Sequence, residues 1–177
     1  METNIIKNYI AGGCKGDLHL SHSSITSLPE GLQVQRDLHL SYCSSLKYLP
    51  NNLKVRGSLV INKSAICSLP EDLEVIQDLI MPYTNISFLP DNLTLKGYLD
   101  LTGSAIISLP KNLKVGKGLM LCETSIKKVS QLPLDLKVGL IISGYFDKND
   151  FIDYRHKALE VNEKLSEDFD IGALEDF

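Results

Sequence analysis

The dipeptide Leu-Pro recurs along this chain at a nearly constant interval. It occurs at residues 28–29, 49–50, 69–70, 89–90, 109–110 and 132–133, with steps of 21, 20, 20, 20 and 23 residues. A period of this length is typical of repeat architectures, in which one unit cannot bury its apolar face alone. We therefore expect a row of stacked units, each in contact with its neighbours.

Two pairs of alternating apolar residues accompany each Leu-Pro. The first pairs are Leu18/Leu20, Leu38/Leu40, Leu59/Ile61, Leu79/Met81, Leu99/Leu101, Leu119/Leu121 and Leu140/Ile142. The second pairs are Leu32/Val34, Leu53/Val55, Leu73/Val75, Leu93/Leu95, Leu113/Val115 and Leu136/Val138. Alternation at period two marks short strands with one buried face. Such short strands need to pair with their copies, so we predict a mainly β solenoid of about seven 20–21-residue coils with parallel strands.

A small polar residue recurs at the bend after each first pair. These residues are Ser23, Ser64, Thr84, Ser104 and Thr124, with Cys43 or Ser44 in the second unit. An inward hydroxyl at this bend can hydrogen-bond backbone groups of its own coil and of the next coil. We interpret the row as a structural ladder, because no catalytic base is positioned near any of the serines.

The unit L-P-x-x-L-x-V-x-x-x-L-x-L-x-x-[S/T]-x-I-x-x resembles the L-x-L-x-x-N-x-L core of leucine-rich repeats over roughly residues 16–146. The Leu-Pro and the 20-residue period look most like the LPX class of repeats in bacterial effector proteins. This resemblance implies a leucine-rich-repeat-like scaffold. It implies no ubiquitin-ligase activity, because the segment that follows the repeats contains no cysteine.

Two departures from that family pattern keep a second fold open. Ser or Thr replaces the usual Asn, and the additional L-x-V pair lies where the family has a shorter link. The alternative is therefore a two-sheeted parallel β-helix. A β-helix of pentapeptide repeats fits less well, because the apolar positions of one unit show no five-residue period.

Both ends of a solenoid expose an apolar cross-section and need caps. Residues 1–15 are predicted to form the N-terminal cap, with a helix over 3–11 that starts at Thr3. Its apolar side chains are expected to face the first coil: Ile5, Ile6, Tyr9 and Ile10. The solenoid should occupy 16–146, a C-terminal capping helix 147–166, and an acidic flexible tail 167–177.

The net charge of −4 is unevenly distributed. Residues 147–177 carry ten acidic against four basic side chains, whereas residues 1–146 carry 12 acidic against 14 basic ones. No Lys/Arg cluster indicates nucleic-acid binding, so none is expected. The four cysteines show no metal-binding spacing and are expected to be reduced, small, buried hydrophobes: Cys14, Cys43, Cys67 and Cys122.

No apolar run approaches the ~18 residues that span a bilayer. The first residues also lack the basic and apolar regions of a signal peptide. We therefore expect a cytoplasmic protein where it is synthesised, with no membrane partner. The resemblance to effector repeats adds delivery into a host cell as a further expectation.

The middle residue of each first pair should point away from the core. This outward column reads His19, His39, Val60, Ile80, Asp100, Met120 and Ile141. Val60 and Ile80, extended by Met120, are expected to form an exposed apolar stripe on a concave strand face. The flanking aromatic residues are Tyr42, Tyr83 and Tyr98. Such stripes mark interaction sites, so we predict protein binding here.

Two other outward sets indicate ordinary surface. His19 and His39 should lie ~5 Å apart in adjacent coils. A third metal ligand is not evident, so a charge-balanced patch with Asp17 and Asp37 is the preferred interpretation. The outward residues of the second pairs are predicted to be solvated surface: Gln33, Lys54, Glu74, Thr94, Lys114 and Lys137.

The chain has no Gly-rich phosphate loop, no H-E-x-x-H and no G-x-S-x-G. We therefore expect a protein that is not an enzyme and needs no cofactor. The preferred function is a bacterial or phage-encoded effector or modulator that docks a partner protein on the strand face. One alternative is self-association into a homodimer. The other is an inhibitor or nucleic-acid-mimicking decoy that acts through the acidic C-terminal segment.

Overall fold

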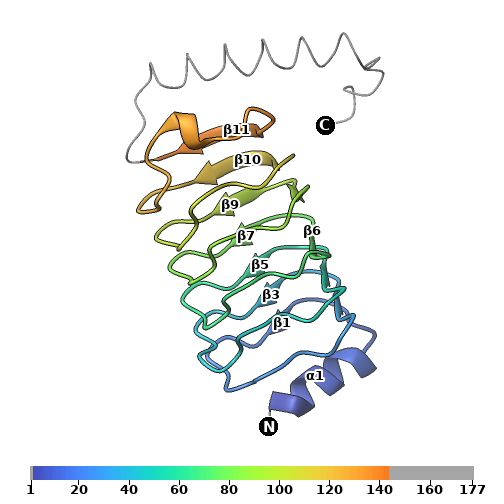
Figure 1. The fold of residues 1–177 in the computed structure, drawn as a ribbon. Helices are drawn as coiled ribbons and strands as arrows, with labels where there is room; N and C mark the ends of the chain where they lie inside the picture. Colours follow the sequence, from blue (N-terminus) through green and yellow to red (C-terminus); the bar gives the residue numbers. More distant parts are fainter. Residues whose placement is uncertain (1, 144–177) are drawn as a thin grey trace, which may run out of the picture.

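The computed structural model describes residues 2–143, which form a stack of coils with one helix at its N-terminal end (Figure 1). The main sheet runs in the order β1-β3-β5-β7-β9-β10-β11, with β8 also paired to β10. Its strands are β1 (Leu18–His19), β3 (Leu38–His39), β5 (Leu59–Val60), β7 (Leu79–Ile80), β8 (Thr94–Leu95), β9 (Tyr98–Asp100), β10 (Lys114–Met120) and β11 (Lys137–Ile142). Seven successive strands correspond to about six full turns, so the predicted solenoid is confirmed.

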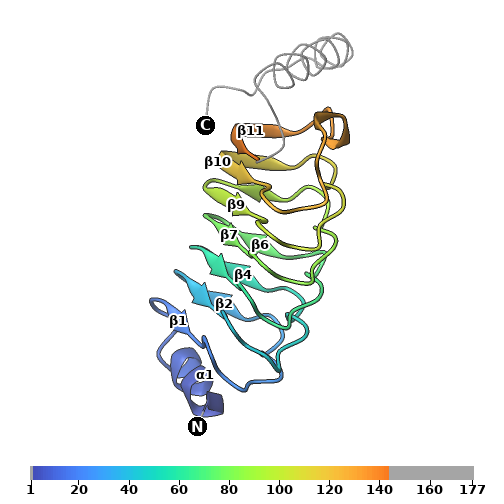
Figure 2. The ribbon, with the colours of Figure 1, turned by 90° about the vertical axis from the view of Figure 1, so that its left-hand side faces the viewer.

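A second parallel sheet lies on another side of the first coils. It contains β2 (Gln33–Val34), β4 (Lys54–Val55) and β6 (Glu74–Val75), which lie beside one another in Figure 2. Its position in the later coils is taken by β8 and by the first half of β10. The additional L-x-V pair therefore forms strands of its own, and the two-sheeted alternative is the arrangement observed.

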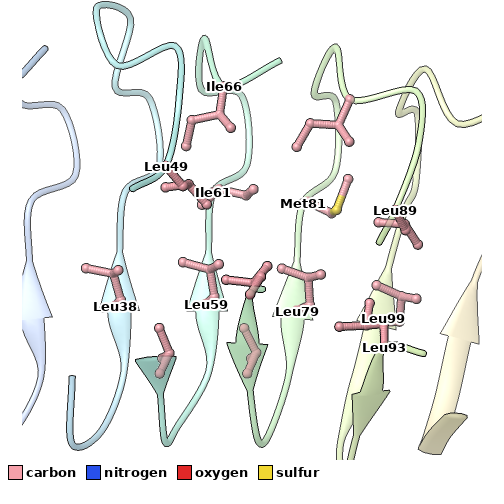
Figure 3. Close-up of a cluster of buried hydrophobic side chains, with 14 of the residues drawn as sticks. Leu38, Leu49, Leu59, Ile61, Ile66, Leu79, Met81, Leu89, Leu93 and Leu99 are labelled. Atoms are coloured by element: carbon pink, nitrogen blue, oxygen red, sulfur yellow. The ribbon is translucent and has the colours of Figure 1, made fainter. Parts of the chain in front are cut away.

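The core consists of columns of apolar side chains from equivalent positions in successive coils. Leu38, Leu59 and Leu79 lie at the same level of their coils, with Ile61 and Met81 on the next level (Figure 3). All five are fully buried. Burial of each such side chain stabilises the fold by ~1.5–3 kcal/mol. Because every coil contributes the same positions, the apolar column is continuous along the stack.

The four cysteines are all free, as expected. Burial was predicted correctly only for Cys43, which takes the place of the small polar residue in its coil. Cys67 is exposed, whereas Cys14 and Cys122 are half-buried. Their positions fall in the bends outside the leucine columns, where the coil offers no enclosed space.

The buried hydroxyl row forms only part of the predicted ladder. Thr84 and Thr124 donate to the carbonyl oxygens of Met81 and Leu121, at 2.9 and 2.8 Å. Ser64 and Ser104 are equally buried, but their hydroxyls have no hydrogen-bond partner among the described residues. The bond within the coil is therefore confirmed for the two threonines. A bond between coils is not formed at these four positions, but it is formed earlier in the row, where the Ser23 hydroxyl and the Cys43 thiol lie 3.6 Å apart.

Carboxylates and glycines fit together where each coil turns from the second sheet to the first. The Asp37 Oδ1 accepts the backbone N–H of Ser58 at 2.7 Å, and Asp78 Oδ1 accepts that of Tyr98 at 2.7 Å. A Cβ on Gly57 would lie 2.1 Å from the Asp37 oxygen, and one on Gly97 would lie 1.8 Å from the Asp78 oxygen. At these two junctions the aspartate of one coil leaves room only for glycine in the next coil, whereas Arg36 occupies the equivalent position after Asp17.

The helix α1 (Glu2–Ala11) covers the first coil. Ile6 is buried, and the Tyr9 hydroxyl donates to the carbonyl of Cys14 at 2.6 Å. Ile5 and Ile10 remain exposed, contrary to the prediction that all four apolar residues face the coil. A single edge of flat coil contacts only a narrow stripe of a helix.

The last described coil departs from the repeat. The short 3-10 helix Val129–Gln131 lies in the three-residue insertion before β11. The pairing of β10 with β11 shifts between Val115 and Gly118, so that Leu119 pairs with Ile141 and Met120 with Ile142. Ile141 therefore packs against the core, and Leu140 and Ile142 are exposed. The helix predicted over 147–166 and the tail over 167–177 lie outside the described residues.

Candidate functional site

The outward residues of the main sheet form one continuous central column. Cα pairing joins His19 to His39, His39 to Val60, Val60 to Ile80, and Ile80 to Asp100. Met120 follows Asp100, and Ile142 follows Met120. We call this the central column: His19, His39, Val60, Ile80, Asp100, Met120 and Ile142. We refer to this surface of the main sheet (Figure 1) as the strand face.

Only part of the predicted apolar stripe is continuous along the central column. Val60 and Ile80 are direct neighbours and are half-buried on a side of the sheet that nothing in the described chain covers. Asp100 separates Ile80 from Met120, since each pairs with Asp100 in turn. Ile141 was placed in this column by its spacing, and that placement is wrong. The shift in β11 turns Ile141 inward and puts Ile142 in the outward position.

A second column follows the bend on one side of the strand face. Its members have left-handed backbones with φ between 50° and 62°. We call this the turn column: His22, Tyr42, Lys63, Tyr83, Gly103 and Glu123. Only one of the six is glycine, although a bulky residue pays about 1 kcal/mol or more for this conformation. Side chains are thus retained at a position where the backbone favours glycine or asparagine.

The side chains of the turn column stack on one another. The rings of His22 and Tyr42 lie 4.6 Å apart with 9° between their planes. The Lys63 ammonium lies 5.9 Å from the Tyr42 ring and 5.4 Å from the Tyr83 ring. Tyr83 in turn covers Gly103, where an added Cβ would lie 2.4 Å from the ring. This packing holds two partly exposed tyrosines next to the apolar pair. Tyr42 lies in the coil before Val60, and Tyr83 lies in the coil of Ile80.

The opposite border of the strand face is polar at first and aromatic later. Asp17, Asp37, Ser58 and Asp78 occupy it in the first four coils, and Tyr98 follows. Tyr98 is exposed and has the Lys117 ammonium 5.5 Å from its ring. The predicted tyrosines therefore flank the central column from two sides: Tyr42 and Tyr83 on one, Tyr98 on the other.

The histidines stack at the N-terminal end of this face. The rings of His19 and His39 have centroids 4.5 Å apart, which confirms the expected separation. His19 Nε2 lies 3.9 Å from an oxygen of Asp17, and Arg36 Nε lies 3.7 Å from the other oxygen. This is a patch of mixed charge, as predicted. Among residues 2–143, no group of three or more His, Cys, Asp or Glu side chains is arranged to hold a metal ion.

Several side chains that shape the strand face were not anticipated. His22 and Lys63 belong to the turn column, and Leu140 and Ile142 extend the apolar surface at its C-terminal end. The period of the turn column was visible in the sequence, but its members share no chemistry: His, Tyr, Lys, Tyr, Gly and Glu. Only their common backbone conformation reveals them as one set.

The remaining surfaces have fewer features that indicate a binding site. On the second sheet, a shallow open hollow of about 430 Å³ runs over the first coils, and Lys54, Arg56 and Glu74 are among its lining residues. The Lys54 ammonium and the Glu74 carboxylate form an ion pair of 2.6 Å across it. Tyr48 and Phe88 are exposed singly on the third side of the coil. No helix within the described range is long and apolar enough to cross a bilayer.

Comparison with known proteins finds no matching family model, no match among curated proteins and no match among solved structures.

Proposed function

We propose that this chain is a non-catalytic scaffold that binds a partner protein on the strand face. The observation that carries the proposal is the turn column, in which Tyr42 and Tyr83 keep a backbone conformation that glycine adopts without strain. Non-glycine residues in strained conformations cluster at binding and catalytic sites. Here they frame an apolar pair, Val60 and Ile80, that no other part of the described chain covers.

The composition of this surface supports a protein partner over a small molecule. Tyrosine and methionine are enriched at the centres of protein interfaces, and Val60 and Ile80 supply apolar contact area. Small-molecule sites are concave and enclosed, and the hollow of about 430 Å³ described above lies over the second sheet, not over this face. The resemblance of the repeats to LPX effector repeats is the basis for proposing a bacterial or phage-encoded effector or modulator as the setting.

Two substitutions test this function without disturbing the core. Ile80→Glu places a charge in the apolar pair. Tyr83→Gly removes a ring and relaxes a strained backbone, since glycine already occupies the same position as Gly103 in the next coil. Both variants should keep the wild-type melting temperature or exceed it, and both should lose the partner. Phe88→Ser is the matched control, because serine stands at the equivalent positions 68 and 108.

The measurement is quantitative mass spectrometry of proteins retained from the native host by tagged wild type and by the three variants. A partner should be retained by wild type and by Phe88→Ser, and reduced at least about tenfold, or ~1.4 kcal/mol, with either strand-face variant. Equal retention by all four proteins would contradict the proposal. Light scattering against concentration identifies a second copy of the chain as the partner if wild type dimerises and Ile80→Glu does not.

A further inference from the structure

Four lysines gather at the C-terminal end of the solenoid, where β8 and the first halves of β10 and β11 continue the side of the coil that the second sheet occupies. Lys114 and Lys137 are Cα partners in β10 and β11, so their backbones lie one strand spacing apart, ~4.8 Å. Lys117 also belongs to β10, Lys96 lies in the preceding coil between β8 and β9, and all four side chains are exposed. We call this the lysine patch: Lys96, Lys114, Lys117 and Lys137. The sequence pattern predicted ordinary solvated surface here.

A strip without side chains runs through the lysine patch. Gly116 and Gly139 occupy the outward positions between Lys114 and Lys137 on one side and Lys117 on the other. Packing requires these glycines: a Cβ on Gly116 would lie 2.4 Å from the Lys96 carbonyl oxygen, and one on Gly139 would lie 2.5 Å from the Lys117 carbonyl oxygen. The consequence is an open, flat floor bordered by ammonium groups.

The acidic residues of the same coils do not neutralise the lysine patch. Asp91 accepts the backbone N–H of Lys111 at 3.0 Å, and Asp135 accepts that of Asn112 at 2.8 Å. Asp100 accepts the N–H of Thr102 on the strand face, at 2.9 Å. Glu123 lies in the turn column. The carboxylates of these coils are thus directed to backbone groups and to other sides of the coil.

The first coils of the same sheet show the contrast. There Lys54 faces Glu74 in the next coil and forms a 2.6 Å ion pair. At the other end Lys114 faces Lys137, and no ion pair joins either of them to an acidic side chain among residues 2–143. Like charges directly opposite on neighbouring strands are destabilising. A ligand rich in carboxylates would relieve that repulsion.

We propose that the lysine patch binds the acidic segment 167–177 of this same chain. That segment contains five acidic residues and no basic residue. It is separated from β11, which carries Lys137, by the 24 residues 143–166. A linker of that length reaches up to ~80 Å when extended, and still ~40 Å with the helix expected over 147–166, so the last coils lie within its reach. Attachment to the same chain gives an effective concentration of about millimolar, which favours this segment over a separate acidic partner.

Zero-length crosslinking of the full chain tests the proposal. A carbodiimide joins a carboxylate and an amine as an amide only where the two groups touch, and the linked peptides are identified by mass spectrometry. The Lys54–Glu74 ion pair supplies an internal positive control. Links from the lysine patch to Glu167, Asp168 or Asp170 are expected at low salt. They should fall several-fold in ~1 M salt, where the screening length is only about 3 Å.

Variants separate patch binding from general attraction. The double variant Lys114→Gln and Lys137→Gln should reduce the remaining links to segment 167–177 several-fold, whereas Lys54→Gln should leave them unchanged. Links spread equally over lysines on other sides, such as Lys47 and Lys63, would overturn the proposal. So would links found only between chains in a mixture of ¹⁵N-labelled and unlabelled protein. Neither result bears on the strand face, because the double variant leaves Lys117, whose ammonium lies 5.5 Å from the Tyr98 ring, unchanged.

Discussion

At the scale of single residues, the buried hydroxyl groups of successive coils stand in the same position but differ in their bonding. Thr84 and Thr124 donate to a carbonyl within their own coil, whereas Ser64 and Ser104 leave a buried oxygen without a partner. A buried polar group without a hydrogen bond costs ~1–3 kcal/mol. The column is thus built from two kinds of site with opposite responses to loss of the hydroxyl.

This difference predicts opposite outcomes for two similar substitutions. Ser104→Ala removes an unsatisfied oxygen and should leave the free energy of unfolding unchanged or raise it by up to about 1 kcal/mol. Thr124→Val keeps the shape but removes the bond to Leu121 and the acceptor for the Ile126 N–H, and should lower it by ~1–2 kcal/mol. Urea unfolding followed by circular dichroism measures both. An equal loss in the two variants would show that the Ser104 hydroxyl is satisfied in solution.

At the scale of elements, one polar group, the Tyr9 hydroxyl, joins α1 to the rest of the fold. The Tyr9 hydroxyl donates to the Cys14 carbonyl at 2.6 Å and accepts the Gln35 N–H at 3.3 Å, which joins the helix to its exit turn and to the first coil. Burial, the largest cause, raises the pKa of Tyr9 above its ordinary value of 10.0, and the Gln35 N–H opposes it. The folded state therefore prefers the protonated phenol.

The sign of this pKa shift gives a pH dependence. Because the folded-state pKa is raised, the contribution of Tyr9 to stability is complete below pH 10 and is lost as pH rises through the folded pKa. Tyr9→Phe should lower stability at neutral pH by ~1 kcal/mol. The difference between the two proteins should then shrink above pH 10. Thermal unfolding of both from pH 7 to pH 11 checks this, since the two proteins differ only at residue 9. A constant difference across that range would mean that the phenol is not held by these contacts.

The elements themselves differ in how far the sequence determines them. The inward leucines predicted every strand of the main sheet up to β10, because period-two alternation has one physical solution in a stack of coils. The second sheet followed from the L-x-V pairs, although only as an alternative. The register of β11 was mispredicted at Ile141, because the last coil is one residue shorter between Val138 and Ile141 than its neighbour is between Val115 and Leu119.

The strand face was predictable in part for the same reason. His19, His39, Val60 and Ile80 lie in the column that their spacing indicates. The partnership of Tyr42, Lys63 and Tyr83 was not predictable, since it depends on left-handed backbones that non-glycine residues seldom adopt. Likewise, the lysine patch emerges only when Lys114 and Lys137 are seen as paired and the nearby carboxylates as engaged elsewhere.

At the scale of the whole molecule, each coil contacts only the coils before and after it, because every described strand pairing joins adjacent coils. Stability in such a stack is approximately a sum over units and their interfaces. The Cα pairing of Leu59 with Leu79 and of Val60 with Ile80 means that these two coils are superposable after 20 residues. A complete coil is therefore a removable unit, and half a coil is not.

Deletion of residues 59–78 joins Ser58 to Leu79 and preserves the order of both sheets. The shortened chain should fold, with a strand signal in circular dichroism and a free energy of unfolding lower by roughly one sixth. Deletion of residues 59–68 is the control, because it removes half a period and places polar bend residues against the leucine columns. That variant should be unfolded or aggregated. Equal folding of both variants would contradict the stacking of superposable coils, whereas failure of the 20-residue deletion alone would show that the coils are not interchangeable at this junction.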